Sequence, residues 1–173
     1  ASDKNFLIDN AKPSTAWDGN QSWQSTDANV HLTCSDSTGS GCLLTQYRLD
    51  TDASNAVSFG SWLTFDANIF IFSDGNFALD FNSSDRAGNS GDTNSFFVLI
   101  DRTLPTIFIT NSTHFSQSTS FALSFEGTDS QSGIQKFWVS SDAQTWIDNG
   151  NNLSHTFSIS PGESLPVTKT FFV

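Results

Sequence analysis

Apolar and polar residues alternate along most of this chain, which is the pattern of strands that bury one face. The segments 29–34 and 77–81 alternate in this way, and Asp74 and Gly75 before the second segment predict a hairpin turn. Turn residues separate many such short segments, a spacing typical of a β-sandwich. Because no segment has a convincing helical period, we predict an all-β fold.

Two similar strings of residues divide the chain into repeated modules. Residues 5–13 and 97–105 both read as an apolar strand, an Asp, three residues and a Pro. Proline fixes its own φ and favours an extended residue before it, so each string predicts a last strand that leads into a stiff joint. The predicted domains are a closing or donor strand at 1–10, a β-sandwich at 11–103 and an incomplete β-sandwich at 104–173.

The two predicted modules share their order of strands and loops. The loop at 33–42 and its plainer counterpart at 127–133 both place Asp, Ser and Gly after an alternating strand. Residues 168–173 correspond to the strand around 77–81, and the sequence stops there. We therefore expect the second sandwich to lack its last strand.

The charge balance excludes some classes of partner. The 173 residues carry a formal net charge of −11, with seven Lys and Arg residues in total. Phosphate backbones are bound through clustered basic residues, so we expect no nucleic-acid partner, and the acidic balance favours divalent cations instead. No run reaches the roughly 18 to 20 apolar residues that span a bilayer, so we expect no membrane insertion.

Three strings of residues carry a resemblance to a known family. They are the loop at 32–42, the loop Ser-Asp-Arg-Ala-Gly-Asn at 84–89 and the joint Ile-Asp-Arg-Thr-Leu-Pro at 100–105. As a set they resemble the tandem immunoglobulin-like repeats of bacterial and archaeal surface proteins. The resemblance implies tandem immunoglobulin-like β-sandwiches in an extracellular filament or a cell-surface adhesin stalk, and not an enzyme. The second module departs from the family pattern because it lacks the Cys pair and the Ala-Gly-Asn loop.

Cys34 and Cys42 flank a turn that contains two glycines. Such a turn can bring two strand ends within the roughly 5.5 to 6 Å Cα separation of a disulfide, and an exported protein favours oxidation. We predict that these two residues form a disulfide. A zinc site is the weaker alternative, because no nearby Cys or His completes a tetrahedral shell.

Acidic turns predict a Ca²⁺ site, although no cofactor is required by the fold. The loops with Asp36 and with Asp85 and Asn89 are expected at the same end of the first sandwich, near a joint that carries Asp9 or Asp101. Ca²⁺ takes several oxygen ligands, so these residues are candidate ligands. The alternative is that the same side chains simply cap their turns.

Four Asn-x-Ser/Thr sequons make glycosylation a further candidate for an exported protein. The candidate acceptors are Asn20, Asn82, Asn111 and Asn152.

A carbohydrate-binding, lectin-like module that takes surface glycans is the alternative function. Trp138 is expected to face outward from its strand, and Trp17 and Trp23 lie in a polar stretch. Flat aromatic rings stack on sugars, but the same rings could cover a module joint or a neighbouring subunit. Catalysis is not expected, because the three His residues share no spacing and the two Glu residues lie at a strand end and in a turn.

The two ends of the sequence complement each other in this scheme. Residues 1–9 form a strand without a module, and the incomplete second module has an opening for one. If the chain is complete, residues 1–9 of one copy fill the second module of the next copy by strand addition, and this head-to-tail contact propagates. If the chain is a fragment, adjoining modules of one long polypeptide supply that strand. The candidate subunit contacts are Phe6, Leu7, Ile8, Phe171 and Phe172.

Overall fold

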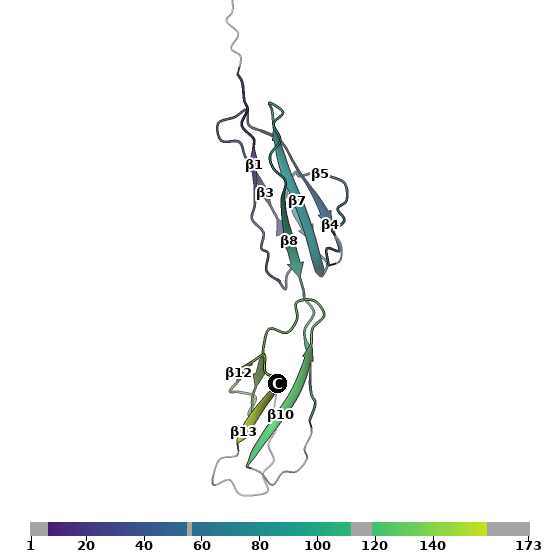
Figure 1. Cartoon of the computed structure of the whole chain (residues 1–173), viewed down its shortest axis with the longest axis vertical. Coiled ribbons are helices and arrows are strands. Elements are labelled where there is room, and N and C mark those ends of the chain that lie inside the picture. The colour runs from purple at the N-terminus through teal and green to yellow at the C-terminus, as the bar shows by residue number, and fades with distance from the viewer. Residues whose placement is uncertain (1–6, 55–56, 112–118, 159–173) are drawn as a thin grey trace, which may run out of the picture. The chain divides into compact units, whose positions relative to one another are not determined.

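The computed structural model describes residues 7–54, 57–111 and 119–158, which form strands, turns and loops (Figure 1). The all-β prediction is confirmed for these ranges. They contain no helix that is long and apolar enough to cross a membrane. The chain divides into two compact units, Ala1–Arg102 and Thr103–Val173.

The first unit is built around a four-stranded antiparallel sheet. Its order is β5-β4-β7-β8, so the long strand β7 lies between β4 and β8 (Figure 1). Two further strand pairs, β1 with β3 and β2 with β6, complete the unit. The strands are β1 (Ser14–Trp17), β2 (Ala28–Val30), β3 (Leu32–Ser35), β4 (Cys42–Asp50), β5 (Leu63–Thr64), β6 (Ile69–Ile71), β7 (Gly75–Asp85) and β8 (Asn94–Ile100).

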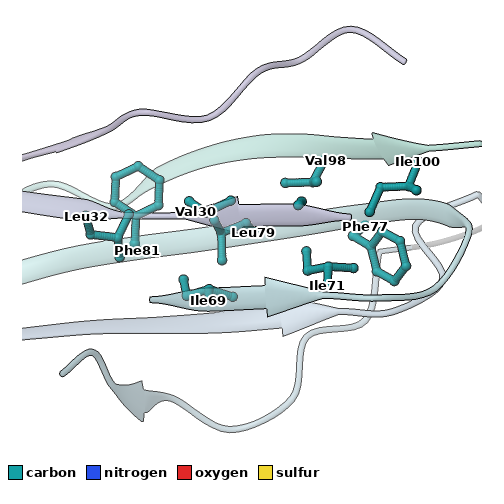
Figure 2. Packing of buried hydrophobic residues seen from close by; sticks show 10 residues of the cluster. Val30, Leu32, Ile69, Ile71, Phe77, Leu79, Phe81, Val98 and Ile100 are labelled. Atoms are coloured by element: carbon teal, nitrogen blue, oxygen red, sulfur yellow. The ribbon is translucent and has the colours of Figure 1, made fainter. Parts of the chain in front are cut away.

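The inward row of β7 forms the centre of the core of the first unit. Phe77, Leu79 and Phe81 alternate along the strand, and each is at most 4% exposed. Burying such a side chain contributes about 1.5 to 3 kcal/mol. Figure 2 shows these residues pointing toward buried side chains of neighbouring strands. The other labelled core residues are Val30, Leu32, Ile69, Ile71, Val98 and Ile100.

The turn at Asp74 and Gly75 does not form the predicted hairpin. Strand β6 before the turn pairs with β2, whereas β7 after the turn pairs with β4 and β8. The turn therefore carries the chain from one sheet to another. The prediction was wrong because an Asp-Gly pair favours a tight turn locally and does not determine whether the two flanking strands pair with each other.

The second unit has a smaller core. One sheet has the order β13-β10-β9, and β11 pairs with β12. Four side chains, Leu123, Phe125, Phe137 and Val139, are buried together. The predicted counterpart of β7 at 168–173 lies outside the described residues. The strands are β9 (Thr106–Ile109), β10 (Ser120–Thr128), β11 (Phe137–Val139), β12 (Ile147–Gly150) and β13 (Ser154–Ser158).

Candidate metal centre

The loop between β3 and β4 is closed by a disulfide. Cys34 in β3 and Cys42 at the start of β4 form the predicted disulfide, and their Cα atoms lie 6.3 Å apart. Cys42 lies opposite Asp85 in the ladder between β4 and β7. The disulfide therefore holds the loop beside the end of β7.

Three carboxylates meet at this end of the first unit. Asp9 comes from the segment before β1, Asp36 from the disulfide-closed loop and Asp85 from the last position of β7. One carboxylate oxygen from each lies within 4.8 Å of the others, and Asp85 is fully buried. We call these three residues the carboxylate cluster. Like charges at this separation repel, so the cluster requires donors or a cation to compensate them.

Backbone amides of the loop supply part of this compensation. The amide of Gly41 donates to Asp36 Oδ2 over 2.7 Å, and the amide of Ser40 donates to Asp9 Oδ2. Hydrogen bonds from the Ser40 amide, the Ser40 hydroxyl and the Ala11 amide hold the pKa of Asp9 below its ordinary value of 3.8. Asp9 is therefore ionised at neutral pH.

Asn89 contacts the cluster as a hydrogen-bond donor. Its backbone amide donates to Asp85 Oδ1 over 2.8 Å, and its side-chain Nδ2 donates to Asp85 Oδ2 over 2.7 Å. The same Nδ2 also donates to the backbone carbonyl of Asp9 over 3.1 Å. Asn89 is predicted as a candidate cation ligand, and in this structure its side-chain nitrogen contacts two members of the cluster.

These donors leave one oxygen of the cluster without a partner. Asp36 Oδ1 is buried and accepts no hydrogen bond. None of the ion pairs found in the described ranges involves the cluster. The Arg86 guanidinium lies beside Gly41 but forms no ion pair with a carboxylate of the cluster. A Cβ atom at Gly39 would lie 2.5 Å from both carboxylate oxygens of Asp36, so the loop can close on the cluster because this residue is glycine.

The geometry fits a hard divalent cation. Ca²⁺ binds oxygen at roughly 2.3 to 2.6 Å, so two oxygens on one ion lie no more than about 5 Å apart. The three cluster oxygens satisfy this limit without any movement of the backbone. Turn capping and cation binding are not exclusive here, because the caps use Asp36 Oδ2 and leave Asp36 Oδ1 free for an ion.

The structure does not bring Asp101 into the cluster. Asp101 follows Ile100, which pairs with Gly75 at the start of β7, whereas Asp85 ends that strand. The two carboxylates therefore lie at opposite ends of the sheet. Of the five candidate ligands, the fold gathers Asp9, Asp36 and Asp85, with Asn89 beside them.

The counterpart loop of the second unit is a capped turn. Asp129 Oδ1 accepts the amides of Gln131 and Gly133 over 3.1 and 2.9 Å. Within residues 7–54, 57–111 and 119–158, no second group of three His, Cys, Asp or Glu side chains lies close enough to hold one ion. Asp129 therefore caps its turn, which is the role considered above as the alternative for the candidate Ca²⁺ ligands.

The leading segment, residues 7–13, is fixed to the first unit from Asp9 onward. Asp9 Oδ1 accepts the amide of Ala11, Pro13 is buried, and its carbonyl approaches so closely that a Cβ at Gly91 would lie 2.4 Å from it. In contrast, Leu7 is 94% and Ile8 84% exposed. The other predicted subunit contacts, Phe6, Phe171 and Phe172, lie outside the described residues.

The tryptophans considered for sugar binding differ in their surroundings. Trp138 is 42% exposed, and the Lys136 ammonium lies 4.3 Å from the centroid of its ring. Trp17 stacks on Phe96 at 4.5 Å and is partly buried against the core of the first unit. Trp23 is 37% exposed.

No protein-family model matches this chain, and no curated protein matches it. The resemblance to immunoglobulin-like surface repeats therefore remains a prediction from the residues themselves.

Proposed function

We propose that this chain is a structural segment of an extracellular filament or cell-surface stalk, built from immunoglobulin-like β-sandwich modules whose leading segments are fixed by Ca²⁺. Two all-β units with separate cores support a modular structural role. The disulfide between Cys34 and Cys42 supports an oxidising location outside the cytoplasm.

One observation carries this proposal: the leading segment is anchored at Asp9 and exposes large apolar side chains immediately before it. Leu7 and Ile8 make almost no contact with the first unit, although Asp9 is held by the loop and by Asn89. Leaving such side chains in water forgoes about 1.5 to 3 kcal/mol each. A segment of this kind is suited to pack against another module.

The second unit offers an apolar strand edge for such a contact. Every residue of β9 is exposed, including Ile107, Phe108 and Ile109. Strand β9 pairs with β10, and within the described ranges its other edge has no partner strand. Free edges recruit strands from other chains. Docking of Leu7 and Ile8 of one copy against β9 of the next copy would be a head-to-tail contact, which propagates as a filament.

Ca²⁺ would stiffen this assembly at the carboxylate cluster. An ion there would join the leading segment through Asp9, the disulfide-closed loop through Asp36 and the central sheet through Asp85. The direction in which Leu7 and Ile8 leave the first unit would then be fixed by three elements. A fixed direction lowers the entropy lost when the segment docks.

The carbohydrate-binding alternative has weaker support. A sugar ring would stack on an exposed face of Trp138, but the Lys136 ammonium occupies a position over that ring. Lys136 is itself paired with Asp148 over 2.7 Å, which holds the ammonium in place. We therefore favour the structural role.

Sedimentation velocity of the full chain over a range of concentrations, with Ca²⁺ present, tests the proposed assembly. We expect the parent chain to form head-to-tail species that grow with concentration. The variant Leu7→Ser/Ile8→Ser should remain monomeric, because it removes the apolar side chains that dock.

The matched control is Leu43→Ser/Leu153→Ser, which removes two other leucines with exposed fractions of 68% and 55%. This control should associate as the parent does. A parent chain that stays monomeric at every concentration, or a Leu7→Ser/Ile8→Ser variant that associates normally, would contradict assembly through the leading segment.

A further inference from the structure

Asn20 is presented differently from the other sequon asparagines. It is exposed in the loop between β1 and β2, and its Oδ1 accepts the backbone amide of Ser22 over 2.8 Å. This contact is an Asx-turn between the first and third residues of the sequon. Its Nδ2 donates no hydrogen bond to any residue that the structure describes, so the nitrogen that would carry a glycan faces no competition.

Asn82 has both ends of its side chain engaged. It lies within β7, where its Oδ1 accepts Gln46 Nε2 over 3.0 Å and its Nδ2 donates to Thr93 Oγ1 over 3.1 Å. These bonds cross the outer face of the sheet from β4 to the chain before β8. A sugar on Nδ2 would leave a single N–H for the bond to Thr93 and would stand over a hydrogen-bonded sheet.

Asn111 is engaged in a similar way. Its Nδ2 donates to the carbonyl of Ala122 over 2.7 Å, and its Oδ1 accepts the amide of Ser124 over 2.6 Å. The side chain thus pairs with the backbone of β10. Residues 112 and 113 of this sequon lie outside the described ranges.

Asn152 uses its side-chain nitrogen within its own turn. Its Nδ2 donates to the carbonyl of Asn149 over 2.8 Å, and Asn149 Nδ2 donates back to the carbonyl of Asn152 over 2.9 Å. A sugar on Asn152 would leave a single N–H of Nδ2 for its half of this reciprocal contact. Three of the four sequon nitrogens therefore already have partners in the folded chain.

We infer that Asn20 is the N-glycosylation acceptor of this protein. The donor would be an oligosaccharide carried on a lipid through a phosphate ester. A bond forms between Asn20 Nδ2 and the anomeric carbon of the first sugar, and the bond from that carbon to the phosphate oxygen breaks. Nδ2 loses one proton, and the lipid phosphate leaves with the bonding electron pair.

A pocket beside Asn20 provides space for the first sugar. It has a volume of about 290 Å³ and is lined by Asn20 together with polar side chains such as Asp18, Gln24 and Asn29. Carboxylate and amide groups of this kind hydrogen-bond sugar hydroxyls. Val98 contributes an apolar part of the lining. A glycan on Asn20 would therefore lie against the first unit near the loop that joins β1 and β2.

The test is to secrete the full chain from eukaryotic cells that carry out N-glycosylation and to measure its intact mass before and after peptide N-glycosidase. We expect one occupied site. Asn20→Gln and Ser22→Ala should each abolish the mass shift, because they remove the acceptor and the sequon hydroxyl. Asn82→Gln, Asn111→Gln and Asn152→Gln should each retain it.

Ser25→Ala is the matched control, since it removes a hydroxyl from the same loop outside the sequon. It should retain the full mass shift, and near-ultraviolet circular dichroism should show that all secreted variants are folded. A parent chain without a glycan, or an Asn20→Gln chain that keeps the parent's mass shift, would overturn the assignment.

Discussion

Asp142 shows how a single carboxylate organises a turn in the second unit. Its Oδ1 accepts the amides of Thr145 and Gln144 over 2.7 and 2.8 Å, and the hydroxyl of buried Ser140 donates to the same oxygen. These hydrogen bonds lower the pKa of Asp142 far below its ordinary value of 3.8, and the bond from the Thr145 amide has the largest effect. The charged form is therefore favoured by folding.

Acid should destabilise the second unit through this residue. A carboxylate whose pKa is lowered by folding contributes its full stability above about pH 5 and loses it as the pH falls below 3.8 toward the lowered value. We expect Asp142→Asn to be less stable than the parent at pH 7, with a difference that narrows between pH 5 and pH 2. Denaturant unfolding followed by the indole resonances of Trp138 and Trp146 measures this difference.

Ala143→Gly in the same turn is the control. Ala143 has a φ of 58°, a left-handed conformation that glycine adopts more readily. This variant should shift the unfolding midpoint by the same amount at every pH, because it changes no titrating group. If Asp142→Asn and the parent lose stability in parallel as the pH falls, the assigned role of the carboxylate is wrong.

The sequence allowed the members of the carboxylate cluster to be predicted as candidates, but not their roles. Asp36 and Asp85 follow alternating strands, so their position at strand ends could be predicted. The choice between Asp9 and Asp101 could not, because both follow similar apolar strings and the register of β8 against β7 decides which end each occupies. The role of Asn89 as a donor depends on the approach of the Asp9 carbonyl, which has no sequence signal.

The disulfide-closed loop is the element that assembles the site. It carries Asp36 and the amides of Ser40 and Gly41 between two covalently linked strand ends. In the chain-entropy model, closing so short a loop lowers the entropy of the unfolded chain and so raises the free energy of unfolding by about 2 to 3 kcal/mol. The loop was predictable because cysteine spacing and glycine content are local properties of the sequence. In contrast, the pairing of β6 with β2 joins residues that are distant in sequence.

Cys34→Ser/Cys42→Ser should lower the free energy of unfolding of the first unit by about 2 to 3 kcal/mol. It should also weaken cation binding, since Asp36 and its amide partners lose their tether. Urea unfolding of the parent and the variant, each with and without reductant, measures the first effect. Reductant should lower the parent to the level of the variant and leave the variant unchanged; equal stability of the oxidised parent and the variant would contradict this role.

At the scale of the whole chain, the repeated strings at 5–13 and 97–105 led to the prediction of two modules, and the fold has two compact units. The strand partners inside each unit were not predictable, because pairing joins residues far apart in sequence, as in β2 with β6. The carboxylate cluster depends on the same long-range order. It joins position 9 to position 85, so it connects the leading segment to the central sheet.

We propose that the carboxylate cluster holds Ca²⁺ and so fixes the leading segment. Asp36→Asn is the sharpest variant, because it keeps the shape of the side chain, can still accept the amide of Gly41 and removes one of three charges. Asp66→Asn, at an exposed carboxylate outside the cluster, is the matched control.

Calorimetric melting of these chains with chelator and with saturating Ca²⁺ tests the claim most directly. With chelator, Asp36→Asn should melt above the parent, because three unneutralised carboxylates repel. With Ca²⁺, the order should reverse, since an ion at 100 times its dissociation constant stabilises the parent by about 2.7 kcal/mol. Asp66→Asn should follow the parent in both conditions. A parent chain with the same melting temperature in chelator and in Ca²⁺ would contradict the account.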